Sequence, residues 1–213
     1  MLVSGGPRLR GRYHHGDLAP ALVEAGLAQL GERGPAAFSV AEVARRVGVS
    51  TAAPYRHFAD RDTFLAAVAA RAATLLAAAM TEAVDGLADP AERLAGAAGA
   101  YAAFVAEHRV GLDVIFSPGL RAVRDTDLAA TGRAVMSRLL DPSRELAGDG
   151  ALHLVEQVVA LAHGYGTLDA DGFLTADRVT DEPTTARARR AALALIAGAS
   201  GAGARAVVPP SRP

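Results

Sequence analysis

The sequence predicts an all-helical protein of about nine helices, and three observations lead to this prediction. Hydrophobic residues make up 51% of the 213 residues, which is enough to bury a sizeable core. Much of this share is alanine, which favours helices and packs poorly in strands. Apolar residues recur at helical spacing, and no segment reads convincingly as a strand.

The first two helices are predicted from their caps. Asp17 can cap a helix that runs to about Arg33, after which a Gly-Pro pair ends it. Ser39 and Glu42 stand three positions apart, as in a capping box, in which the two residues cap each other's backbone N–H groups. This box opens a second, short helix over 40–47.

A third short helix is predicted directly after the second. Gly48 lets the backbone turn sharply, and Ser50 can cap a helix over 51–57. Pro54 falls in its first turn, where the clash of the ring meets only the cap. Two short helices joined by a tight turn are typical of a helix-turn-helix, whose second helix enters the DNA major groove. By spacing alone, a plain helical hairpin is an equally good interpretation.

The remaining helices are predicted from the same signals. Asp60 can cap a long helix to about Asp85, and Asp89 is a cap followed by proline at the first helical position. The later segments are a helix at 90–108, a short segment at 110–116, and helices at 120–140, 150–166 and 185–199.

Composition excludes several kinds of site. Without cysteine, the chain can form no disulfide, thiolate nucleophile or cysteine-rich zinc site. Its longest apolar stretch, from Phe64 to Met80, is interrupted by Arg71 and is short for a bilayer. No secretory signal is evident. We therefore expect a cytoplasmic protein without a membrane partner.

No catalytic or metal site is predicted. His153 and Glu156 share a helix face, but such pairs usually lie on a solvated face, and His14-His15 has no third ligand nearby. The glycines at 198, 201 and 203 end a helix and follow no strand, so they form no dinucleotide motif. We expect no enzyme activity, no cofactor and no resident metal.

Charge is unevenly distributed along the chain. Residues 1–61 hold eight arginines against five acidic residues, a charge of +3, and the remainder holds fourteen against eighteen, a charge of −4. A mildly basic head suits a nucleic-acid partner. Arginines of the N-terminal arm, Arg8, Arg10 and Arg12, could enter a minor groove, and a solvated tail is an equally good interpretation.

The motifs Val-Gly-Val-Ser at 47–50 and Pro-Tyr-Arg-His-Phe at 54–58, followed by Asp60-Arg61 and Phe64-Leu65, form one gap-free pattern. With it, the segment 17–65 resembles the DNA-binding domain of the TetR (tetracycline-repressor-like) family of transcriptional regulators. The resemblance implies an all-α fold: an N-terminal three-helix helix-turn-helix domain and a C-terminal helical ligand-binding and dimerisation domain. The implied division is 1–62 for the arm and DNA-binding domain, 63–204 for the second domain and 205–213 for a disordered tail.

The resemblance also assigns roles within the helix-turn-helix. It implies that Tyr55 and His57 contact phosphates, and that Ser50, Thr51 and Ala52 face the operator, where methyl groups can contact thymine. Arginine at 61 stands where the family usually has lysine, which changes the donor geometry of a phosphate contact. The predicted DNA-binding residues are Ser39, Val40, Ser50, Thr51, Ala52, Ala53, Tyr55, Arg56, His57, Arg61, Arg10 and Arg12.

For the C-terminal domain, the resemblance implies a ligand cavity among helices at 90–166 and a four-helix dimer interface. The predicted pocket residues are Met80, Tyr101, Phe104, Val105, His108, Phe116, Met136 and His163. The predicted interface residues are Leu152, Val155, Val159, Ala188, Ala192, Leu195 and Ala199. The apolar residues predicted for the pocket and those predicted for the interface could also belong to the protein's own core. Within the family, His163-Gly164 and His108-Arg109 resemble a subgroup with a Trp-His-Gly signature, although the tryptophan is absent here.

The leading hypothesis is a repressor that binds a palindromic operator as a homodimer and is released by a small, mainly apolar effector. Three alternatives remain: a regulator without an effector or an activator, a small-molecule-binding protein whose head no longer reads DNA, and an unrecognised enzyme. Binding to the DNA upstream of its own gene would separate the regulators from the small-molecule-binding protein.

Overall fold

The computed structural model describes residues 18–121, 123, 125–174 and 182–203. The predicted Asp17 cap, the arm residues Arg10 and Arg12, and the predicted tail at 205–213 lie outside the described residues. The described part is helical and contains no strand, which confirms the predicted fold class. Its α-helices are α1 (Leu18–Arg33), α2 (Val40–Val47), α3 (Arg61–Val84), α4 (Pro90–His108), α5 (Leu112–Ile115), α6 (Pro118–Arg121), α7 (Thr126–Ala147), α8 (Ala151–Ala170) and α9 (Thr184–Gly203).

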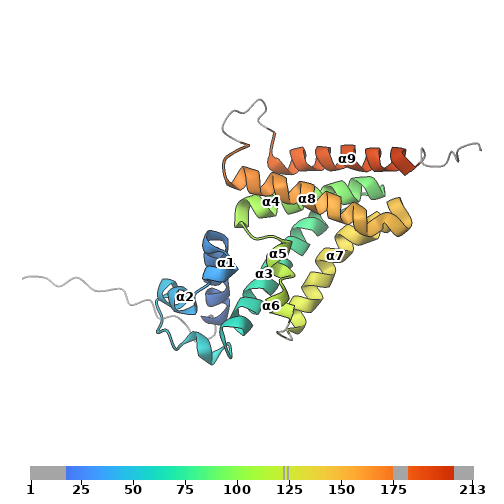
Figure 1. The fold of residues 1–213 in the computed structure, drawn as a ribbon. Coiled ribbons are helices and arrows are strands. Elements are labelled where there is room, and N and C mark those ends of the chain that lie inside the picture. Colours follow the sequence, from blue (N-terminus) through green and yellow to red (C-terminus); the bar gives the residue numbers. More distant parts are fainter. Residues whose placement is uncertain (1–17, 122, 124, 175–181, 204–213) are drawn as a thin grey trace, which may run out of the picture.

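A small head and a larger body are joined by the long helix α3 (Figure 1). The head consists of α1, α2 and the turn that follows α2, and the body consists of α4 to α9. In the body, α4 packs against α3, α7, α8 and α9, so it is the central helix. Every residue from Leu94 to Ala102 is buried, and small residues dominate this run.

Glycines permit the closest approaches to α4. A Cβ atom at Gly99 would lie 2.6 Å from the Thr185 carbonyl oxygen of α9. A Cβ atom at Gly166 of α8 would lie 2.6 Å from the Ala102 carbonyl oxygen. Backbones this close leave no room for a side chain, so the alanine- and glycine-rich composition is the condition for this packing.

Most predicted caps are observed. The Asp60 side chain accepts from the Thr63 N–H at 2.7 Å, and this bond lowers the pKa of Asp60. The Asp89 side chain accepts from two N–H groups at the start of α4. Ser39 caps α2 by accepting from the Glu42 N–H at 3.4 Å. The second half of the predicted capping box is wrong, because the Ser39 N–H donates to Gln29 at 2.7 Å.

Two predicted boundaries in the body were wrong. The helix expected at 120–140 begins at Thr126, where Asp125 accepts from two N–H groups, and it ends at Ala147. It therefore continues through Pro142, which is buried in the core. Packing against α3 and α4 holds this helix together despite the hydrogen bond that proline removes.

Within the described residues, one helix is long and apolar enough to cross a membrane by length and composition. It is α3, and 56% of its most apolar window is buried inside the fold. Its buried side chains include Phe64, Leu76 and Met80, which contact the head and the body. An apolar core helix passes the same test, and α3 has the burial expected of one.

Candidate nucleic-acid interface and body cavity

The segment after α2 forms a tight turn and not the predicted α-helix over 51–57. Only Pro54–Arg56 is helical there, as a short 3-10 turn. Its hydrogen bonds join residues three apart, such as Ala53 N–H to the Ser50 oxygen at 3.0 Å and His57 N–H to the Pro54 oxygen at 2.9 Å. Proline at 54 supplies no N–H to an α-helical ladder, which favours this shorter form. Gly48 ends α2 with φ of 80°, as predicted from its freedom to adopt this conformation.

Aromatic packing fixes which side of this turn faces inward. Phe58 stacks on Phe64 with ring centroids 4.4 Å apart, and Phe38 meets Phe64 edge to face at 5.4 Å. Pro54 is buried beside them. Because the buried Pro54 and Phe58 flank Tyr55, Arg56 and His57 on either side, these three residues lie on the outside of the turn and are exposed.

We define the recognition turn as residues 50–57. Tyr55 is 53% exposed, and within the described part of the chain the side chains of Tyr55, Arg56 and His57 make no hydrogen bond or ion pair. Ser50, Thr51 and Ala52 are also exposed, whereas Ala53 is half-buried. The turn therefore presents a short row of small side chains followed by one guanidinium, one imidazole and one phenol, all free to contact an anionic partner.

Three predicted DNA-contact residues have other roles in the head. Val40 is 6% exposed and belongs to the core. The Ser39 hydroxyl is occupied as the α2 cap. Arg61 donates to the carbonyl oxygens of Pro35 at 2.7 Å and Phe38 at 3.2 Å, so it ties the start of α3 to the α1–α2 connection. These three residues position the recognition turn.

Sequence reasoning missed Gln29, the most deeply buried polar side chain of the head. Its amide oxygen accepts from the Ser39 N–H at 2.7 Å, and its amide nitrogen donates to the Ser39 oxygen at 3.4 Å. This pairing fixes the angle between α1 and α2. The available signal was a glutamine among the apolar positions Gly26 and Leu30. Nearby, Arg46 of α2 bonds Glu32 of α1 and thereby lowers the pKa of Glu32.

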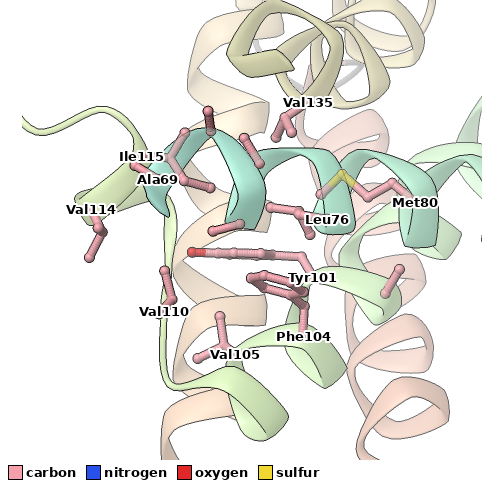
Figure 2. Close-up of a cluster of buried hydrophobic side chains, with 14 of the residues drawn as sticks. Ala69, Leu76, Met80, Tyr101, Phe104, Val105, Val110, Val114, Ile115 and Val135 are labelled. Carbon is pink, nitrogen blue, oxygen red and sulfur yellow. The ribbon is translucent and has the colours of Figure 1, made fainter. Parts of the chain in front are cut away.

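In the body, half of the predicted pocket residues are packed into the core. Met80, Tyr101, Phe104 and Val105 are each at most 4% exposed, and they form part of one apolar cluster with side chains of α3 and α7 (Figure 2). Their burial is that of core side chains, and their assignment to a ligand pocket stays a prediction. A core face and a pocket wall have the same apolar periodicity along a helix. Here the neighbouring helices fill the space beside these side chains.

Tyr101 and His163 form a polar connection inside this core. The Tyr101 hydroxyl accepts from the Leu112 N–H at 3.1 Å and lies 3.0 Å from Nδ1 of His163. Burial raises the pKa of Tyr101 to about 12, so the phenol keeps its proton at neutral pH. This network fastens α8 to the connection between α4 and α5.

An apolar cavity of about 360 Å³ lies elsewhere, between α5, α6 and α7. Of the predicted pocket residues, Phe116 and Met136 line it. His108 lines a separate crevice of about 570 Å³ between α1 and the end of α4. His163 lines a third, smaller space of about 290 Å³. The structure thus brings Phe116 and Met136 together at the apolar cavity, and Val105 lines the third space together with His163.

The predicted interface residues divide in the same way. Ala188, Ala192 and Val155 are buried within the protomer, so their assignment to a dimer surface was wrong. Leu152 is 70% exposed and Ala199 is exposed, while Val159 and Leu195 are half-buried. Gly164 and Gly198 also have open space above them. The outward faces of α8 and α9 therefore carry small and apolar residues.

The short α2, the glycine turn and the exposed recognition turn on a helical body define a helix-turn-helix DNA-binding regulator. Residues 22–68 match the family described as bacterial regulatory proteins, tetR family. The match covers the head and the start of α3, and in this part the chain is similar to the DNA-binding domain of the family. No curated protein matches the chain. The Trp-His-Gly subgroup stays a prediction.

Solved structures with the same fold cover nearly the whole chain. A protein with unknown function from Rhodococcus sp. RHA1 is 29% identical, with a TM-score of 0.65 over 88% of this chain and 98% of that chain. A transcriptional regulator from the same source is 22% identical, with a TM-score of 0.59 over 90% and 100%. A tetR-family transcriptional regulator from Streptomyces coelicolor is 22% identical, with a TM-score of 0.59 over 87% and 82%.

Proposed function

We propose that the chain is a cytoplasmic, ligand-responsive repressor that binds a palindromic operator as a homodimer and is released by a small, mainly apolar effector. The observation that carries the proposal is the recognition turn, where the exposed side chains of Tyr55, Arg56 and His57 make no hydrogen bond or ion pair in the described part of the chain. A dimer with twofold symmetry would present two such turns to two half-sites.

Effector control requires that the body set the position of the head. The helix α3 runs through both, and α1 lies against the end of α4 at Gly31, where a Cβ atom would be 2.2 Å from the His108 carbonyl oxygen. With so little space, movement of the α4 end is transmitted to α1. A ligand that favours one arrangement of the body would then shift the population of DNA-competent dimers.

A gel-shift experiment tests the DNA-binding part of the proposal. The full chain should bind a duplex from the region upstream of its own gene more tightly than an unrelated duplex of equal length. Binding to neither duplex, or equal binding to both at every salt concentration, would show that the head does not read an operator there.

Replacement of Tyr55 or His57 by alanine is expected to weaken binding to all duplexes to a similar extent. Each side chain is exposed, so its loss removes a backbone contact and leaves the fold intact. Gel shifts with operator and unrelated DNA measure the effect, and Glu82→Ala, at an exposed site on α3 away from the turn, is the control. A loss confined to one operator, with unchanged non-specific affinity, would contradict the phosphate role.

Leu152→Glu is expected to convert the dimer to monomers. Leu152 is exposed in the protomer, so the charge costs little there, but burial of this charge in an α8–α9 interface would be strongly unfavourable. Sedimentation velocity measures the oligomeric state, with Ala134→Glu on the exposed side of α7 as the control. An unchanged dimer would place the interface elsewhere.

A further inference from the structure

Arginine pairing singles out one side chain in the body. The other arginines of the body and Arg71 of α3 donate to an acidic side chain, a hydroxyl or a carbonyl wherever the structure describes the side chain. They are Arg71, Arg93, Arg109, Arg138, Arg144, Arg187, Arg189 and Arg190. Arg133 makes no such contact within the described ranges. In the head, the corresponding unpaired arginine is Arg56 of the recognition turn, where a phosphate is expected.

Arg133 lies on α7 and lines the apolar cavity between α5, α6 and α7. The walls contributed by α5 and α7 are apolar and include Ile115, Phe116, Leu128 and Met136. The other charged residue of the lining is Asp125, whose carboxylate accepts from the Asp127 and Leu128 N–H groups at the start of α7. Among the described lining residues, the cavity therefore combines apolar walls with one cation, Arg133, that has no hydrogen-bond or ion-pair partner there.

We propose that this cavity binds an amphipathic organic acid, with its apolar tail against Phe116 and Met136 and its carboxylate paired with Arg133. A volume of about 360 Å³ is within the range of small-molecule sites. A guanidinium matches a carboxylate through two parallel hydrogen bonds, and the walls supply the hydrophobic part of the affinity. The proposal rests on the proposed ligand response and names the chemical class of the effector.

Calorimetric titration of the full chain with decanoate and with decan-1-ol tests the proposal. Both probes have the same tail, so the carboxylate accounts for any difference in affinity. We expect decanoate to bind at least about tenfold more tightly than decan-1-ol, because a charge-assisted bidentate pair is among the stronger polar contacts. Arg133→Gln should abolish this preference, and Arg144→Gln, on the same helix with an exposed ion pair, should retain it.

Equal affinities for the two probes, an unchanged preference in Arg133→Gln, or no binding of decanoate would each overturn the proposal. Gly132→Val provides a second check on the cavity, since a Cβ atom there would lie 3.2 Å from the Phe116 ring and the side chain would occupy the space of the tail. It should abolish binding of both probes. Operator affinity measured with saturating decanoate separates the binding of the acid at Arg133 from the release of DNA by this ligand. If decanoate binds through Arg133 without weakening DNA binding, the acid site stands and the proposed release of DNA by this ligand fails.

Discussion

Replacing Gly166 by alanine is expected to destabilise the protein by about 1–3 kcal/mol, the range for overpacked cores. The new Cβ atom would lie 2.6 Å from both the Ala102 carbonyl oxygen and the Val105 Cβ atom. These neighbours are a backbone group and the first atom of a β-branched side chain, so neither can rotate away. Either α8 must move from α4, or the strain remains in the core.

The control for this substitution lies two residues earlier on the same helix. Gly164 has nothing within 4 Å of an added Cβ atom, so Gly164→Ala should retain or raise stability by up to about 1 kcal/mol through helix propensity alone. Urea unfolding at a fixed protein concentration measures both variants. If the two alanines have the same effect, the α4–α8 contact is not the tight approach described above.

Gly31→Ala is expected to reduce operator affinity by about tenfold or more, which corresponds to about 1.4 kcal/mol of lost binding free energy. A Cβ atom at this position would lie 2.2 Å from the His108 carbonyl oxygen, a distance at which α1 must separate from α4. The head would then change its position on the body. In the proposed symmetric dimer both heads must reach two half-sites at a fixed separation, so a small rotation of each head would remove one of the two contacts.

Gel shifts with an operator selected from randomised duplexes and with a single half-site test this explanation. Affinity for the half-site should change little, since the recognition turn itself is intact. Ala28→Ser, one turn earlier on α1 and exposed to the same crevice, should leave both affinities unchanged. If Gly31→Ala weakens half-site and operator binding equally, the head itself has been damaged and its spacing is not the cause.

Local signals were sufficient to predict where most helices begin and which face of the head is buried. Caps at Asp60 and Asp89 and the turn at Gly48 act through hydrogen bonds and backbone angles within a few residues, so the sequence contains the whole interaction. The recognition turn followed from the same local pattern. Thr51 and Ala52 are exposed as expected and Ala53 is half-buried, and a 3-10 turn replaced the expected helix because Pro54 supplies no N–H.

Only the tertiary structure decided what each apolar stripe and each cation contacts. Periodicity places Tyr101 and Phe104 on a helix face, but a core and a pocket wall have the same apolar pattern, and the difference lies in whether α3 and α7 fill the space. Ala188 and Ala192 have the small size that suits either an interface or the close approach to α4 that is observed. Arg61 and Arg133 are both arginines on helices, yet two carbonyls from the α1–α2 connection engage Arg61, whereas Arg133 lies beside a cavity and has no hydrogen-bond or ion-pair partner among the described residues. Such contacts join residues far apart in the chain, and their formation depends on how whole helices pack.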